Sequence, residues 1–234
     1  MYKLWIFDFD NTLARLEPEV DWAGGRLVLE PYLRSVGAPD ELFERIPRGN
    51  IPLYEAYRTI VLADGNRGRR LTELRRASEI IEKIELAGVE RAKPLDGALE
   101  TLAALKNSGA AVAIVTSNSS RTIKRWFEVN RANPGDLQLD AQLDAIVGRD
   151  SLLALKPAPD MVLRALEILS AQPSDAAFVG DSEADLLAAK NSGLRFYGIA
   201  ASEAARDRLL AAGAAEIYSS PAALAIHLNP LAAG

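Results

Sequence analysis

Short apolar runs that end in polar residues recur along the chain and predict the strands of a sheet. The first covers residues 3–8 and ends at Asp8. Later runs of the same character cover residues 111–115, 144–147, 176–179, 195–199 and 216–218. Helical spacing of apolar residues between them predicts helices over residues 99–105, 119–129, 159–169, 183–192 and 203–212, and a last helix near Pro221. Strands that alternate with helices over short connections are typical of an α/β fold with a doubly wound parallel sheet.

Residues 16–91 carry a different pattern. Strand signals vanish there, and charged amphipathic helix patterns replace them, as in the spacing of Ile80, Ile81 and Ile84 before a stop at Gly88. Glycines and prolines, among them Gly24-Gly25, are expected to divide the stretch into several helices. We therefore predict an all-helical domain at residues 16–91, inserted after the first strand of an α/β core that comprises residues 1–15 and 92–234.

Polar side chains follow four of the predicted strands. The first strand is followed by Asp8, Asp10 and Thr12, the second by Thr116, Ser117 and Asn118, the third by a loop to Lys156, and the fourth by Asp181 and Asp185. Taken singly, each motif has an ordinary explanation as a turn, a helix cap or a surface lysine. The carboxyl ends of parallel strands lie at one edge of a sheet, however, and ligands bind there. We therefore expect these groups to converge.

The composition restricts the chemistry of such a site. The chain has no cysteine, which excludes a thiol nucleophile and cysteine-based metal sites. Its single histidine, His227, lies near the C-terminus in an apolar helix pattern and is expected to be structural or exposed. Carboxylates, hydroxyls, lysine, arginine or a borrowed ion remain, and these groups suit phosphate and Mg²⁺.

Charge and hydropathy also bear on partners. The net charge of −5 argues against a nucleic-acid partner. The longest apolar run, residues 110–115, is far shorter than the roughly 18 residues typical of a membrane span. Acids in the first apolar stretch make it a poor signal peptide, so a cytoplasmic protein without a membrane partner is predicted.

Taken in order, the motifs resemble the haloacid dehalogenase-like (HAD) superfamily of phosphohydrolases. The matching residues are Asp8, Asp10, Thr12, Thr116, Lys156, Asp181 and Asp185. The inserted helical stretch resembles the cap of the phosphoglycolate-phosphatase-like branch. This resemblance implies a Rossmann-like core, a helical cap, and Mg²⁺-dependent hydrolysis of a small phosphorylated metabolite through an aspartyl-phosphate.

The resemblance also implies roles for individual residues. Asp8 is the expected nucleophile, and Asp10 the expected acid and base. Mg²⁺ is expected on Asp8, the backbone carbonyl of Asp10, and Asp181. The phosphoryl group is expected to contact Thr116, Lys156 and the backbone N–H groups near Phe9, Ser117 and Asn118. Two further residues, Thr12 and Asp185, are expected to hold the site residues in place without contacting the substrate. Asp185 is expected to orient Lys156 or a metal-bound water.

Several alternatives remain open. The dehalogenase and phosphonatase members of this superfamily lack an acid at the position of Asp10, and no lysine lies between Lys3 and Lys83 to form the Schiff base of the phosphonatases. A phosphomutase of the β-phosphoglucomutase type and a non-catalytic binding protein are the remaining rivals. The substrate can be phosphoglycolate, a sugar phosphate or a nucleoside monophosphate, and the protein a monomer or homodimer. Candidate cap contacts are Arg34, Arg48 and Arg58, each alternatively a surface ion pair, and Trp22, alternatively a packing residue.

Overall fold

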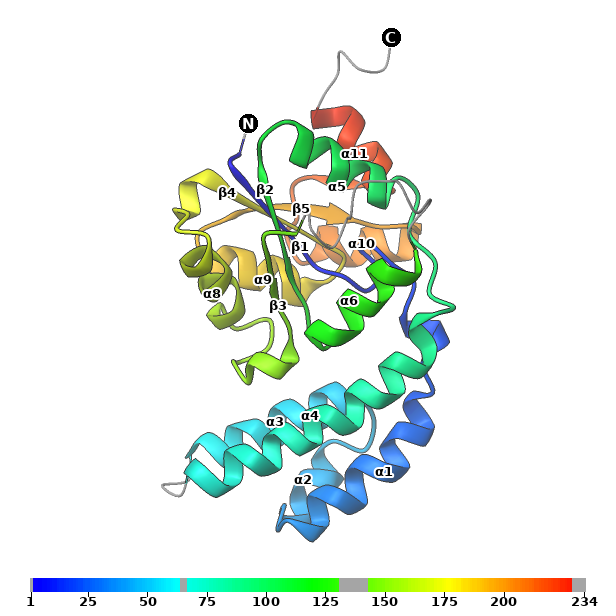
Figure 1. Cartoon of the computed structure of the whole chain (residues 1–234), viewed down its shortest axis with the longest axis vertical. Coiled ribbons are helices and arrows are strands. Elements are labelled where there is room, and N and C mark those ends of the chain that lie inside the picture. Colours follow the sequence, from blue (N-terminus) through cyan, green and yellow to red (C-terminus); the bar gives the residue numbers. More distant parts are fainter. Residues whose placement is uncertain (1, 64–66, 131–142, 229–234) are drawn as a thin grey trace.

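The computed structural model describes residues 2–63, 67–130 and 143–228 of the 234-residue chain. An α/β part carries the sheet, and a purely helical part lies beyond one edge of it (Figure 1). The helical part is formed by the chain between the first strand and α5 (Ala98–Asn107). The two parts meet where the site residues predicted above are found.

The sheet has six strands in the order β3-β2-β1-β4-β5-β6, and every pair is parallel. The strands are β1 (Leu4–Phe7), β2 (Ala111–Val115), β3 (Ala145–Val147), β4 (Ala176–Gly180), β5 (Arg195–Ile199) and β6 (Ile217–Tyr218). Strands β1 and β4 are buried throughout, which explains why they read as unbroken apolar runs. The prediction of a parallel, doubly wound α/β sheet is confirmed.

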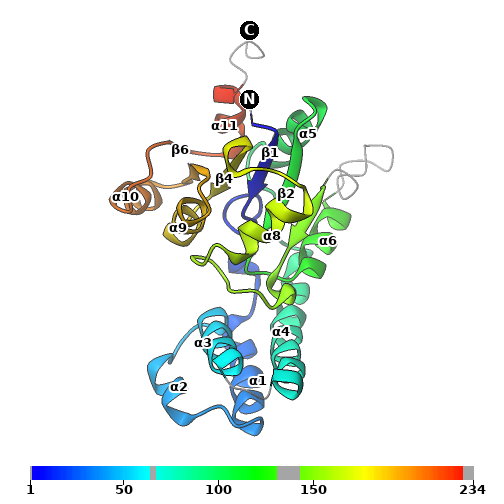
Figure 2. The same cartoon turned by 90° about the vertical axis from the view of Figure 1, so that its left-hand side faces the viewer.

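Helices cover both faces of the sheet (Figure 2). One face buries Trp5 and Phe7 of β1 against α5, α6 (Ser120–Val129) and α11 (Pro221–Leu228). The other face buries Leu4 and Ile6 with side chains of three further helices, namely α8 (Asp160–Ile168), α9 (Glu183–Asn191) and α10 (Glu203–Ala211). Successive side chains of a strand point to opposite faces, so the four residues of β1 anchor both layers.

The described residues between β1 and α5 contain helices and no regular strand. The helices are the 3₁₀ turn η1 (Glu17–Glu19), α1 (Trp22–Ser35), α2 (Asp40–Arg45), α3 (Asn50–Ala63) and α4 (Arg67–Val89). We call this segment the helical insertion. Its core is built by buried side chains such as Leu29 of α1, Tyr57 of α3 and Ile81 of α4. None of the helices in the described part of the chain is long and apolar enough to cross a membrane.

Gly24 and Gly25 do not separate helices, as the sequence led us to expect. They lie in the first turn of α1, where the Asp21 carboxylate accepts a hydrogen bond from the Gly24 N–H at 2.8 Å. A Cβ on Gly25 would lie 2.2 Å from Cδ1 of Ile84. This glycine therefore allows the close approach of α1 and α4 instead of ending a helix.

The centre of the sheet determines where a ligand binds. Strand β1 lies between β2 and β4, so the connections that follow these strands lead to opposite sides of the sheet. Such a switch point opens a crevice at the carboxyl ends of the central strands. Asp8 follows β1 and Asp181 follows β4, which places both acids at this crevice.

Candidate active site

A cavity of about 500 Å³ lies at the carboxyl ends of the strands, between the sheet and the helical insertion. The predicted site residues that line it are Asp8, Asp10, Thr116, Ser117, Asn118, Lys156, Asp181 and Asp185. Phe9 and Thr12 do not line it. The Phe9 ring packs against Trp126 in the core, with 5.2 Å between ring centroids, so this residue can serve the cavity only through its backbone. Thr12 is fully buried.

The turn after β1 holds Asp10 beside Asp8. Asn11 has a left-handed backbone (φ 59°), a conformation that asparagine tolerates, and the turn brings the following residues back over Asp10. The Oδ1 atom of Asp10 accepts hydrogen bonds from the backbone N–H groups of Leu16 at 2.9 Å and Glu17 at 3.1 Å. One carboxylate oxygen is therefore held by the start of the helical insertion, and the other is left for chemistry.

Lys156 joins two of the acids. Its ammonium group pairs with Asp8 and, at 2.6 Å, with Asp185, and it donates a hydrogen bond to the Val115 carbonyl at 3.2 Å. The other oxygen of Asp185 accepts hydrogen bonds from the N–H and, at 2.6 Å, the hydroxyl of Ser182, which caps α9. Both oxygens of Asp185 are thus engaged, and this acid fixes the lysine.

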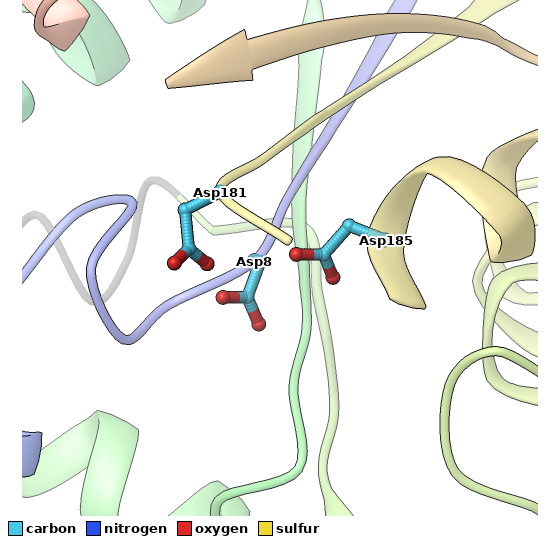
Figure 3. A group of neighbouring side chains, drawn as sticks. All are labelled: Asp8, Asp181 and Asp185. Carbon is cyan, nitrogen blue, oxygen red and sulfur yellow. The ribbon is translucent and has the colours of Figure 1, made fainter. Parts of the chain in front are cut away.

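Carboxylate oxygens of Asp8, Asp181 and Asp185 lie within 4.8 Å of one another. Figure 3 shows the three groups turned toward a common point, from the ends of two strands and the first turn of α9. Burial raises the pKa of Asp8 to about 7, and repulsion by Asp185 adds to this although Lys156 opposes it. Burial, followed by repulsion from Asp8 and Asp185, raises the pKa of Asp181 to about 8. One lysine therefore does not neutralise the cluster.

These residues fit a divalent cation. The available ligands are all oxygens, which Mg²⁺ prefers. Burial, and after it repulsion by neighbouring carboxylates, raises their pKa values, and a cation here would compensate their negative charge. Asp8 and Asp181 are the suited pair, because Asp185 is occupied by Lys156 and Ser182.

The pKa values of Asp10 and Lys156 are both raised, but for different reasons. Burial raises the pKa of Asp10 to about 6, although the N–H groups of Glu17 and Leu16 lower it. Burial lowers the pKa of Lys156, but the charges of Asp185 and Asp8 raise it by more, so the lysine stays a cation. A carboxyl group with a pKa near neutrality can both give and take a proton at physiological pH.

The loop after β2 forms another part of the cavity wall. The Thr116 hydroxyl donates a hydrogen bond to the side-chain oxygen of Asn118 and accepts one from the Asn118 N–H, both at 3.1 Å. Ser119 caps α6 by accepting a hydrogen bond from the Thr122 N–H at 3.1 Å. The loop thus lines the cavity with Thr116, Ser117 and Asn118. The N–H groups of Asn118 and Ser119 at this helix N-terminus have acceptors within the protein, namely the Thr116 hydroxyl and the Glu85 carboxylate.

Two charged residues behind this loop were not identified from the sequence. Glu85 of α4 and Arg149, which follows β3, form an ion pair of 2.6 Å with no exposed surface on either side chain. Glu85 also accepts hydrogen bonds from the Asn118 side chain and the Ser119 N–H, and Arg149 donates one to the Ser117 carbonyl at 2.7 Å. The pair thus connects the helical insertion to the loop that lines the cavity. Nothing in the local sequence marks it, because α4 is rich in charges throughout.

The arginines proposed as cap contacts do not line the cavity. Arg34 is paired with acids on the surface of the helical insertion, Arg58 is paired with Glu55 at 2.8 Å, and Arg48 is exposed. Trp22 does line it, and its indole N–H donates a hydrogen bond to the Glu17 carbonyl at 3.1 Å. His227 lies on α11, half-exposed, and is not among the residues around the cavity.

Together, the fold and the cavity define an α/β enzyme core of the Rossmann-like kind, with its site at the switch point of the sheet. The family model of the haloacid dehalogenase-like hydrolases matches residues 5–199. The chain therefore belongs to this family of hydrolases, and the family expected from the motifs is confirmed.

Relatives and solved structures agree with this assignment. The chain is 31% identical to the phosphoglycolate phosphatase of Aquifex aeolicus over 82% of both chains. It is 30% identical to the validoxylamine A 7′-phosphate phosphatase of Streptomyces hygroscopicus subsp. limoneus, over 85% of this chain and 86% of that one. The crystal structure of CbbY from Rhodobacter sphaeroides in complex with phosphate superposes with a TM-score of 0.64 over 96% of each chain at 23% identity, which shows the shared fold.

Proposed function

We propose that the protein is a Mg²⁺-dependent phosphatase that hydrolyses a small phosphomonoester through an aspartyl-phosphate on Asp8. The observation that carries this proposal is the cluster of Asp8, Asp181 and Lys156 in the cavity at the switch point, next to Asp10. Phosphoglycolate, a sugar phosphate and a nucleoside monophosphate are all admissible substrates. The reaction would take place in the cytoplasm, in a monomer or homodimer.

Asp8 is the nucleophile in this proposal. A carboxylate oxygen of Asp8 forms a bond to phosphorus as the bond from phosphorus to the leaving oxygen breaks. The ion pair with Lys156 holds the carboxylate in place and keeps a positive charge beside the phosphoryl oxygens. Because Asp185 holds Lys156 from the other side, its contribution is to position this lysine.

Asp10 moves the protons. Its pKa of about 6 lets it protonate the leaving oxygen in the first step. In the second step the Asp10 carboxylate takes a proton from a water molecule, whose oxygen attacks phosphorus and releases inorganic phosphate and the Asp8 carboxylate. Hydrogen bonds from Leu16 and Glu17 orient one oxygen of Asp10 and leave the other free for both transfers.

Mg²⁺ would be held by Asp8, Asp181 and the backbone carbonyl of Asp10. Its positive charge would reduce the repulsion between the phosphate and these acids. The Thr116 hydroxyl and the N–H groups near Phe9, Ser117 and Asn118 would bind the phosphoryl oxygens. Thr12, buried beneath the turn, would support the backbone that carries Asp8 and Asp10.

We further propose that residues 16–91 form a cap domain and that residues 1–15 and 92–234 form the catalytic core. The helical insertion contributes Trp22, Asn50, Ile51 and Pro52 to the cavity wall. A cap in this place would exclude water from the phosphoryl group and contact the leaving group.

Phosphate release tests the proposal. A panel of phosphomonoesters is incubated with the protein and Mg²⁺, and inorganic phosphate is measured for the wild type and for Asp8→Asn. We expect release by the wild type and almost none by the variant. Asp175→Asn, which removes a surface carboxylate paired with Lys3, is the matched control and should keep the wild-type rate.

Two outcomes would favour the rivals. Transfer of the phosphoryl group to an added sugar phosphate, without release of phosphate, would favour a phosphomutase. Binding of phosphomonoesters without turnover would favour a non-catalytic protein. The set of Asp8, Asp10 and Lys156 in one cavity favours the phosphatase, because a binding protein has no need for clustered carboxylates beside an anion.

A further inference from the structure

The half of the cavity that would receive the leaving group comes from the helical insertion. Its side chains belong to Glu17, Trp22, Asn50, Ile51 and Pro52. Among the described residues that line the whole cavity, the one cation is Lys156, at the opposite end and already paired with two acids. The leaving-group half thus offers a carboxylate, an amide, an indole and aliphatic groups, with no positive charge.

Glu17 gives this half a negative charge. Its backbone N–H is bonded to the Asp10 carboxylate, and its own carboxylate accepts a hydrogen bond from the Asn11 side chain at 3.2 Å. Both contacts keep Glu17 beside the proton donor of the reaction. A second anionic group on the substrate would approach Glu17 without a counter-ion among the described residues that line this cavity, and like charges brought together in this way oppose binding.

Asn50 adds an acceptor that lacks a donor. The residue is 2% exposed, and its side-chain N–H donates a hydrogen bond to the Trp22 carbonyl at 2.9 Å. This bond sets the orientation of the amide, because the flipped amide would place two oxygens against each other. Its Oδ1 atom has no hydrogen-bond partner among the described residues. A buried acceptor without a partner is uncommon, and a ligand hydroxyl would satisfy it.

We propose that the substrate's leaving group is an uncharged alcohol with further hydroxyl groups, as in a sugar or polyol phosphate, and that esters with a second anionic group are poor substrates. Glu17 and Asn50 determine this specificity, the first by repulsion and the second by accepting a hydroxyl. The Trp22 indole provides the flat apolar surface against which the C–H face of a sugar ring packs. The inference rests on the proposed phosphatase activity.

A matched pair of substrates isolates the effect of a second negative charge on the substrate. 2-Hydroxyethyl phosphate and 2-phosphoglycolate differ only by a CH₂OH group in place of a carboxylate. We expect kcat/KM to be at least about tenfold higher for the uncharged ester, and the ratio to shrink as salt is added. Equal or higher kcat/KM for 2-phosphoglycolate would overturn the proposal.

Two variants test whether Glu17 and Asn50 cause the substrate preference. Glu17→Gln should raise kcat/KM for 2-phosphoglycolate relative to 2-hydroxyethyl phosphate, whereas Glu19→Gln should leave the ratio unchanged. Glu19 belongs to the same 3₁₀ turn, is paired with Arg91 at 3.0 Å, and does not line the cavity. Asn50→Leu should lower kcat/KM for a sugar phosphate more than for p-nitrophenyl phosphate, which has no hydroxyl to donate. An unchanged ratio in Glu17→Gln, or equal losses in Asn50→Leu, would contradict the assignment.

A neighbouring cavity of about 470 Å³ offers the competing explanation. It shares Asn11, Glu17 and Asp181 with the first cavity but is also lined by Arg15 and Arg208. If 2-phosphoglycolate were preferred and Arg208→Ala removed that preference, the second anion would bind there and the proposal would be wrong.

p-Nitrophenyl phosphate separates failure of this inference from failure of the proposed function. Hydrolysis that is lost in Asp8→Asn, together with a preference for 2-phosphoglycolate, would leave the phosphatase intact and refute the specificity. Absence of hydrolysis with every ester would refute the phosphatase and the specificity with it.

Discussion

Glu85 and Arg149 form a fully buried ion pair that joins the helical insertion to the loop lining the cavity. Glu85 lies on α4 and Arg149 in the 3₁₀ turn after β3, 64 positions apart. Their remaining hydrogen-bonding groups are directed to Ser78, Ser117, Asn118, Ser119 and Thr122. The charges are satisfied only while the insertion and the loop are in contact.

Removal of one partner of this pair should be costly. Glu85→Gln leaves the Arg149 guanidinium buried without a counter-charge, and such changes destabilise proteins by about 3–5 kcal/mol. Urea unfolding measures the loss. Glu82→Gln, one turn earlier on α4 and paired with the exposed Arg121, is the control and should change stability by less than about 1 kcal/mol. Equal stability of Glu85→Gln and wild type would show that the pair does not hold the interface.

Asp10→Asn should separate the two chemical steps. Asparagine keeps an oxygen for the N–H groups of Leu16 and Glu17 but cannot transfer a proton. With p-nitrophenyl phosphate, whose leaving group needs no proton, we expect a burst of p-nitrophenol near one equivalent per enzyme, followed by turnover about 10²–10⁴-fold slower than wild type. With an alkyl phosphate the burst should be absent. A full-rate steady state with either ester would exclude Asp10 as the acid and base.

The sequence was sufficient to predict the sheet and the position of Asp8, Thr116 and Asp181 because each of these residues directly follows a strand. A buried parallel strand is an unbroken apolar run, and the residue that follows it lies at the carboxyl edge of the sheet. Asp181 is a clear case. Ser182 and Asp185 form the capping box of α9, so Asp181 is not needed as a cap and faces the cavity.

Contacts between segments far apart in the sequence could not be predicted in this way. Glu85 reads as one more acid of a charged helix until Arg149 is placed against it. Asn50 and Trp22 meet across 28 positions, and only their contact reveals which amide atom lacks a partner. Gly25 was misread because its role depends on Ile84 of another helix.

Mg²⁺ should stabilise the folded protein through Asp181. A ligand that binds only the folded state adds about 2.7 kcal/mol at a concentration 100 times its Kd. Thermal unfolding with Mg²⁺ against EDTA should therefore show a higher Tm with the metal in the wild type and no such difference in Asp181→Asn. The control Asp175→Asn should respond as the wild type does. A Tm that rises equally in Asp181→Asn would place the metal elsewhere.

Without metal, the carboxylate cluster should make stability fall as pH rises. Burial and mutual repulsion raise the pKa of Asp8 to about 7 and that of Asp181 to about 8, so the folded state holds protons that the unfolded state has released. The free energy of unfolding therefore falls as pH rises, by up to about 1.4 kcal/mol per pH unit for each proton, between about pH 4 and pH 8.

Urea unfolding in EDTA at several pH values measures this fall in the free energy of unfolding. Asp181→Asn isolates the contribution of the site, because every other titrating group is retained. The variant should become progressively more stable than the wild type as pH rises through this window, since it lacks a carboxyl group whose ionisation is opposed by burial and by repulsion from Asp8 and Asp185. A stability difference that stays constant across the window would show that the pKa of Asp181 is not raised in the folded protein.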